Sequence, residues 1–90
     1  MANAPEIQTV EQSDDYYHVR FRDPDSFSTI RTPDWAANAA GAVVDGSEVR
    51  MGKRADGDDW SVESVLLPVD GTDRDDVESQ ARRIVEKVES

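Results

Sequence analysis

The residues best suited to binding a ligand are four arginines, a histidine and a tyrosine in the first half and middle of the chain. Arginine guanidinium groups favour phosphate or carboxylate ligands, and a tyrosine or histidine ring can stack on a base, as in proteins that bind nucleic acids on a sheet surface. Residues 16–54 contain six basic and five acidic residues, a net charge of +1, whereas the whole chain carries −10. This local balance predicts a ligand- or partner-binding face formed by Tyr16, His18, Arg20, Arg22, Arg50 and Arg54.

A simpler interpretation of the same arginines is that they pair with neighbouring acids. Outward arginines on strands often do so, here with Glu48 or Glu63, and such exposed pairs stabilise little and bind nothing. The net charge of −10 also argues against unspecific DNA binding, which depends on bulk positive potential. Nucleic acid is therefore a possible partner but not the favoured one.

Catalytic chemistry has little support in the residues. His18 is the single histidine, and a lone strand histidine without an obvious orienting partner is more often structural or exposed than a general base. The chain has no cysteine, no Gly-x-Ser-x-Gly setting and no glycine-rich phosphate loop. We therefore predict no catalytic residue, metal ligand or cofactor. An enzyme built on His18 and a carboxylate stays open only if a concave pocket encloses His18.

Two further groups have both a chemical and a structural interpretation. The turn Asp56-Gly57-Asp58-Asp59 offers oxygen ligands for a divalent cation, but it does not match the twelve-residue calcium loop, and a solvated turn is favoured. Trp35 and Trp60 are suited to stack on a ligand, and Trp35 to contact a second copy of the chain. Core packing is the favoured interpretation of both tryptophans.

The element that organises the chain is a β-hairpin over residues 48–69. In the first arm, Val49 and Met51 alternate with polar or small residues, which is the period of a half-buried strand. The second arm is apolar at both parities in its later half, as expected of an inner strand covered on both faces or running into a tight core. The turn between the arms contains Gly57, and Pro68 ends the ladder because it has no amide hydrogen to donate.

Two more strands are predicted before the hairpin. Residues 16–22 alternate, with Tyr17, Val19 and Phe21 at one parity and polar side chains at the other. A turn at residues 23–26 leads into a short extended segment at residues 27–30. Residues 1–15 are expected to be a polar N-terminal tail or a short edge strand.

Two helices complete the pattern. Thr32-Pro33-Asp34 has the residue types of a helix start, with Thr32 as the capping residue, and Asp45-Gly46 is a helix stop. The second helix is predicted to start with Thr72 as its cap. Its apolar residues recur at helical spacing: Val77, Ala81, Ile84, Val85 and Val88.

These elements predict a single α+β domain over residues 16–90. The order β(β)αββα fits a two-layer sandwich in which an antiparallel sheet of three to four strands carries both helices on one face. The opposite face would then be open to solvent or to a partner. A second copy of the chain would add core that a ninety-residue monomer lacks.

Twenty acidic residues stand against ten basic ones, of which only Lys53 and Lys87 are lysines. Self-repulsion at this charge becomes tolerable when salt shortens the screening length. In composition alone, the whole chain resembles the small acidic proteins of halophilic archaea, and no functional family is recognised by motif. The resemblance implies a salt-adapted protein. Without a signal-peptide pattern or an apolar run long enough to span a membrane, we expect a cytoplasmic location and no membrane partner.

The favoured function is a non-enzymatic interaction or regulatory module whose exposed sheet face meets another protein or a second copy of the chain. The alternative is an accessory protein that binds nucleic acid or another anion through the arginine-rich face.

Overall fold

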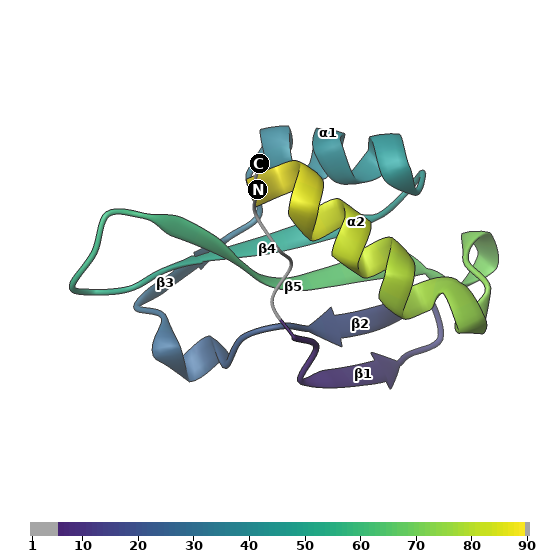
Figure 1. Cartoon of the computed structure of the whole chain (residues 1–90), viewed down its shortest axis with the longest axis horizontal. Coiled ribbons are helices and arrows are strands. Elements are labelled where there is room, and N and C mark those ends of the chain that lie inside the picture. Colours follow the sequence, from purple (N-terminus) through teal and green to yellow (C-terminus); the bar gives the residue numbers. More distant parts are fainter. Residues whose placement is uncertain (1–5, 90) are drawn as a thin grey trace.

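The structure is a computed structural model that describes residues 6–89. It consists of one antiparallel five-stranded sheet and two helices, and Figure 1 shows both helices on the same side of the sheet. The strand order is β1-β2-β5-β4-β3. The strands are β1 (Thr9–Gln12), β2 (Tyr16–Arg20), β3 (Thr29–Arg31), β4 (Glu48–Lys53) and β5 (Trp60–Pro68), and the helices are α1 (Asp34–Val43) and α2 (Val77–Glu89).

The α+β prediction is confirmed, but the sheet has five strands rather than three to four. Both edge strands are short, β1 with four residues and β3 with three. Because a period of two is a weak signal over so few residues, their sequences alone do not distinguish strand from loop. Strand β1 lies within the segment interpreted as a tail or edge strand, of which residues 1–5 lie outside the described part of the chain.

The predicted hairpin is present as β4 and β5, and it contains a β-bulge. The pair Arg50↔Ser64 is followed by Met51↔Val62, so Glu63 has no partner in the ladder. The extra residue shifts the parity of the strand: Val62 before the bulge and Val65 after it are both buried under the helices. The apolar residues at both parities of β5 therefore partly reflect the bulge, and β5 is the inner strand that was predicted, with residues 62–65 all buried.

Helix α2 has the predicted core stripe. All five apolar residues named above are buried, and the outward pair Glu78 and Arg82 lies within 3.9 Å. The predicted start is wrong, because a 3₁₀ turn at Arg74–Asp76 precedes the helix and the Thr72 side chain caps nothing. The Thr72 Oγ1 atom is instead buried without a hydrogen-bond partner in the described residues.

Helix α1 packs closely on the sheet through small residues. Ala36 and Ala40 are fully buried, and α1 contacts both β4 and α2. The helix starts one residue later than a Thr32 cap would require: Pro33 occupies the N-cap position, without a side-chain cap. After the helix, Gly46 adopts a φ of 85°, the left-handed conformation expected of the predicted stop.

The face of the sheet opposite the helices is partly covered by the chain itself. Strand β2 lies beside β5 and β3 lies beside β4, so the connection between β2 and β3 must cross two strands. On its way it forms the 3₁₀ turn Pro24–Ser26 and places the Phe27 ring against Gly52 of β4. The expected open face is therefore crossed at one end by residues 21–28, seen at the lower left in Figure 1.

Candidate functional site

Four of the six predicted site residues share the outward face of the sheet. The register places Arg20 opposite Ser64 and Ser64 opposite Arg50, so the two arginines lie in one row across three strands. In the next row, His18 lies opposite Leu66. Tyr16 has the same parity as His18 on β2. Strands β2 and β4 thus bring Tyr16, His18, Arg20 and Arg50 to one face.

Arg22 and Arg54 do not join this face. The Arg22 Nη1 atom donates to the Val62 carbonyl oxygen at 2.6 Å and to Glu89 Oε2 at 3.0 Å, at the end of α2. Arg54 lies in the hairpin turn, where it and Arg22 line a separate cavity of about 370 Å³ beside Phe27 and two aspartates. The six side chains therefore form two groups and no single arginine-rich surface.

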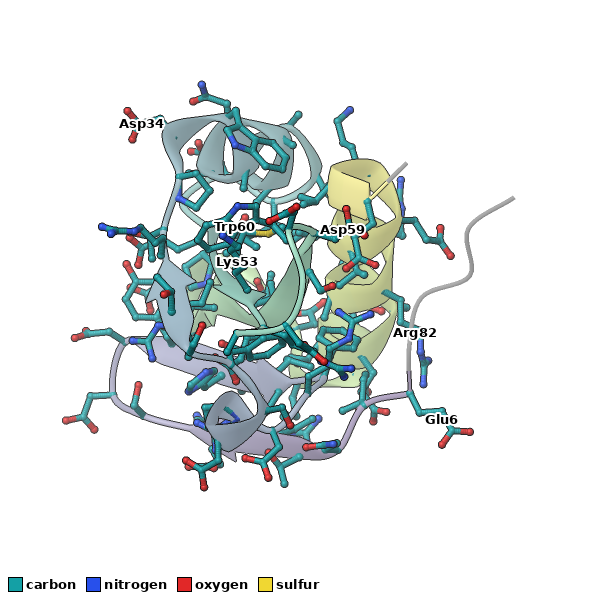
Figure 2. The ribbon with its side chains drawn as sticks, turned by 90° about the vertical axis from the view of Figure 1, so that its left-hand side faces the viewer. Glu6, Asp34, Lys53, Asp59, Trp60 and Arg82 are labelled. Atoms are coloured by element: carbon teal, nitrogen blue, oxygen red, sulfur yellow. The ribbon has the colours of Figure 1, made fainter. Side chains whose placement is uncertain are left out.

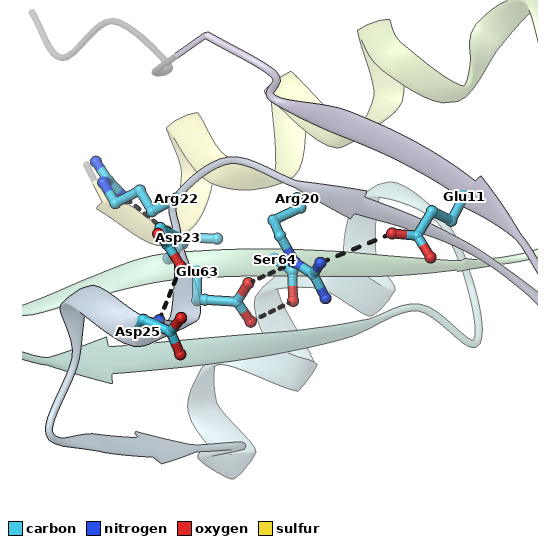
Figure 3. Close-up of polar contacts among 8 residues, drawn as sticks. Glu11, Arg20, Arg22, Asp23, Asp25, Glu63 and Ser64 are labelled. Carbon is cyan, nitrogen blue, oxygen red and sulfur yellow. Dashed lines mark hydrogen bonds and ion pairs between the residues drawn. The ribbon is translucent and has the colours of Figure 1, made fainter.

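Arg20 is held by a buried carboxylate. Glu63 is 1% exposed; its Oε2 accepts from Arg20 Nε at 3.2 Å and its Oε1 accepts from the Ser64 hydroxyl at 2.8 Å. Glu11 on β1 lies 3.7 Å from the same guanidinium group (Figure 3). For Arg20, pairing with Glu63 is the interpretation that the structure confirms. A buried carboxylate needs such partners, so this guanidinium has limited freedom to bind a ligand.

Arg50 differs from Arg20 because it is exposed and unpaired. No side chain within residues 6–89 forms an ion pair or a hydrogen bond with it, including Glu48 on the same strand. Of the arginines that the described residues bring to the outward face of the sheet, Arg50 is therefore the one whose guanidinium group is available to an anion.

His18 is partly enclosed by charged neighbours. Burial of the imidazole, followed by the Arg20 and Arg50 charges, lowers the pKa of His18, while Glu63 and Glu11 oppose the shift. Its Nε2 atom is buried without a hydrogen-bond partner in the described residues. His18 lines neither the cavity beside Arg22 nor the two described below. None of these three cavities is therefore the enclosing pocket that an enzyme centred on His18 would require.

The lowered pKa makes the protein's stability depend on pH. Protonation of His18 costs more in the folded than in the unfolded state, so its contribution is full above about pH 6.5 and falls as the pH drops towards the lower folded pKa. We expect the urea midpoint to decline between pH 7.5 and 5.5 less steeply in His18→Gln than in the unmodified chain. Equal slopes for the two proteins would contradict this assignment.

A second candidate site lies at the hairpin end of the molecule, between α1 and the sheet. Its cavity of about 220 Å³ is lined by Trp35 of α1 and Trp60 of β5, with Arg31, Pro33 and Met51 completing the wall. We name these five residues the tryptophan cleft. Trp35 is 55% exposed and Trp60 41%, so the prediction that both tryptophans pack in the core is wrong.

The position of each tryptophan explains its exposure. Trp60 has the same parity as buried Val62 and therefore points to the helix side of the sheet, but the hairpin extends beyond the helices there (Figure 1). Trp35 lies in the first turn of α1, where the helix has just begun. The position of each tryptophan at the start of an element explains why it is left uncovered: Trp35 follows Asp34, the first residue of α1, and Trp60 follows Asp59 of the hairpin turn.

Basic side chains flank the cleft. Lys53 lies opposite Trp60 in the β4–β5 ladder, and Arg31 is part of the cleft wall. Asp34 and Asp59 directly precede the two tryptophans in the sequence, but Figure 2 shows them apart, on opposite sides of Trp60, and Asp59 lines the cavity beside Phe27. Among residues 6–89, none of these four charged side chains has an ion-pair or hydrogen-bond partner.

A third cavity, of about 310 Å³, lies at the other end of the hairpin. Its polar wall includes Thr72, Gln80 and three aspartates, and Thr72 Oγ1 and Gln80 Oε1 have no hydrogen-bond partner among residues 6–89. No group of three or more metal-ligating side chains occurs in the described part of the chain. The solvated-turn interpretation of residues 56–59 is consistent with the exposure of all four.

None of the helices within residues 6–89 is long and apolar enough to cross a membrane. Comparison of the chain with protein-family models, with curated proteins and with solved structures found no match.

Proposed function

We propose that the protein is a non-enzymatic interaction module that contacts another protein chain through the tryptophan cleft. One observation carries this proposal: Trp35 and Trp60, two of the large apolar side chains that the fold leaves exposed, line the same cleft. Exposed apolar groups gathered at one place are typical of binding surfaces. Tryptophan and arginine, both present in the cleft, are also the residue types most enriched among interface hot spots.

The cleft is better suited to this role than the sheet face. Arg20 and Arg22 of the predicted arginine face are already bound to Glu63 and Glu89. The connection through Phe27 crosses one end of that face. The alternative of anion or nucleic-acid binding there therefore depends mainly on Arg50, and a single exposed guanidinium group gives weak affinity in a chain of net charge −10.

The proposal predicts that removing the indoles abolishes binding and leaves the fold intact. Peptides selected from a displayed random library against the unmodified chain should lose at least about thirtyfold in affinity for Trp35→Ala or Trp60→Ala, because truncating a hot-spot residue costs about 2 kcal/mol or more. Both side chains are about half exposed and lie outside the buried core, so far-UV circular dichroism should not change.

The matched control is Arg83→Ala on the exposed side of α2, far from the cleft in the sequence and without an ion pair within residues 6–89. It should bind the selected peptides like the unmodified chain. Peptides that bind both tryptophan variants undiminished would contradict a role for the cleft.

A further inference from the structure

We infer that the partner segment bound in the tryptophan cleft is an acidic peptide with one large apolar side chain. Its carboxylates pair with Arg31 and Lys53, and its apolar side chain lies against Trp35 and Trp60. The inference rests on the proposed function, since it names the chemistry of the partner at the same surface. Three properties of the cleft support it: the side on which its basic groups lie, the charge of its wall, and its small apolar volume.

The basic groups lie on the same face of the sheet as the Trp60 indole. Lys53 is paired with Trp60 and Arg31 with Met51 in the ladders, and residues paired in this way carry their side chains on one face. Figure 2 shows Lys53 beside Trp60. Neither basic side chain has an ion-pair or hydrogen-bond partner within residues 6–89. Two cations are therefore free to pair with carboxylates of a partner at the cleft.

The wall of the cleft contains no acidic side chain in the part of the chain that the structure describes. This sets it apart in a chain with twice as many acidic as basic residues, since the other two cavities described above both have aspartates in their walls. A peptide carboxylate meets two cations at the cleft and meets acids at the other two hollows. Charge complementarity of this kind decides which partner a surface accepts.

The net charge of −10 does not reverse this preference. At an ionic strength of about 0.15 M the screening length is about 8 Å, so a bound peptide interacts mainly with the charges beside it. The cleft, and not the whole chain, then sets the sign of its partner. Long-range repulsion still slows the encounter of an acidic peptide with the chain. Binding therefore needs the apolar contact as well as the ion pairs.

The size of the cleft favours a single apolar side chain. Its volume of about 220 Å³ is below the range of about 300–1,000 Å³ that holds a drug-sized ligand, and its wall is apolar apart from Arg31. A large apolar side chain between two indoles is the usual energetic centre of an interface. Single-stranded nucleic acid is disfavoured, because it needs a basic groove along its backbone and the cleft offers two cations.

The peptides selected from the random library give the first test. We expect their common sequence to have an excess of aspartate and glutamate around one aromatic or leucine residue. The chain as a whole attracts basic peptides through its net charge of −10, so acidic selected sequences would report the cleft itself. Selected peptides that need both tryptophans but have no acidic excess would overturn this inference and leave the proposed function standing.

A matched set of synthetic peptides measures the charge preference. Tryptophan emission reports binding directly, because both tryptophans of the chain line the cleft. In about 0.15 M KCl, the blocked peptide Glu-Asp-Phe-Asp-Glu should bind at least about tenfold more tightly than Lys-Lys-Phe-Lys-Lys or Glu-Asp-Gly-Asp-Glu. In about 1 M KCl the difference between the acidic and the lysine peptide should shrink, because salt screens exposed pairs. Equal affinities in the lower salt would overturn the inference.

Charge reversal at the cleft gives the sharper test. Arg31→Glu/Lys53→Glu should bind the acidic peptide at least about tenfold more weakly than the unmodified chain and the lysine peptide more tightly. The control Arg74→Glu/Arg83→Glu makes the same change in net charge at exposed positions that do not line the cleft, and it should keep the original preference. Undiminished binding of the acidic peptide to the cleft variant would contradict the pairing with these two residues.

The remaining outcomes separate other occupants. If no selected peptide depends on the tryptophans, both this inference and the proposed function are removed. Stronger quenching of tryptophan emission by an oligothymidylate than by the acidic peptide would overturn both in favour of nucleic acid. A dimer in sedimentation velocity that Trp35→Ala dissociates, without binding of the acidic peptide, would replace the acidic partner with a second copy of the chain.

Discussion

Replacing Arg20 by methionine should destabilise the fold by about 3–5 kcal/mol, the range measured when one partner of a buried ion pair is removed. The Glu63 carboxylate is 1% exposed, and besides Arg20 it contacts only the Ser64 hydroxyl among the interactions described above. Without the guanidinium group, a negative charge stays buried with one hydrogen bond. Urea unfolding followed by far-UV circular dichroism measures the loss.

The double variant Arg20→Met/Glu63→Leu separates the buried charge from the lost contacts. Because it removes both partners, it should recover most of the stability that Arg20→Met loses, as apolar replacements of buried pairs do elsewhere. Arg83→Met is the matched control for loss of an exposed arginine and should stay within about 0.5 kcal/mol of the unmodified chain. If Arg20→Met behaves like that control, Glu63 is not held by Arg20.

Replacing Gly52 by valine should cost about 1–3 kcal/mol or more through overpacking. A Cβ atom built at Gly52 would overlap the Phe27 ring, closer to its Cγ than non-bonded carbon atoms approach. The ring belongs to the connection that crosses the sheet, so a side chain at Gly52 must displace that connection from β4. The urea midpoint and the slope of the transition measure the effect.

Gly57→Ala is the control for this prediction, because nothing lies within 4 Å of a Cβ atom at that turn position. It should change stability by no more than about 0.5 kcal/mol. In a Phe27→Ala background, Gly52→Ala should cost little, since the atoms that would clash are gone. A Gly52→Val protein as stable as the unmodified chain would show that the ring does not rest on the strand.

Much of the secondary structure was determined locally. The alternation of Tyr17 and Val19 identified β2, and the apolar stripe of α2 identified its buried face, because each pattern repeats over several residues with one dominant period. The exact starts of the two helices were not determined by local sequence. Thr32 and Thr72 have the composition of caps, yet neither caps, because whether a hydroxyl reaches a backbone amide depends on the path of the chain before the helix.

What only the tertiary structure decided was the direction of individual side chains. The bulge at Glu63 reversed the parity of β5, a one-residue effect that period-two reasoning does not contain. It brings a carboxylate beneath Arg20 and takes this arginine out of the predicted site. Arg22 contacts α2, which no spacing within β2 could indicate.

The tryptophans also show that the tertiary structure decides which side chains are exposed. Their hydrophobicity favours burial, and the parity of Trp60 with Val62 correctly gives the helix side of the sheet. Whether a helix covers that side depends on where α1 begins and how far the hairpin extends, and these are properties of the assembled layers. The sequence by itself thus determined the elements and their buried stripes. The assembled fold decided which side chains were left uncovered, because exposure depends on contacts between residues far apart in the chain.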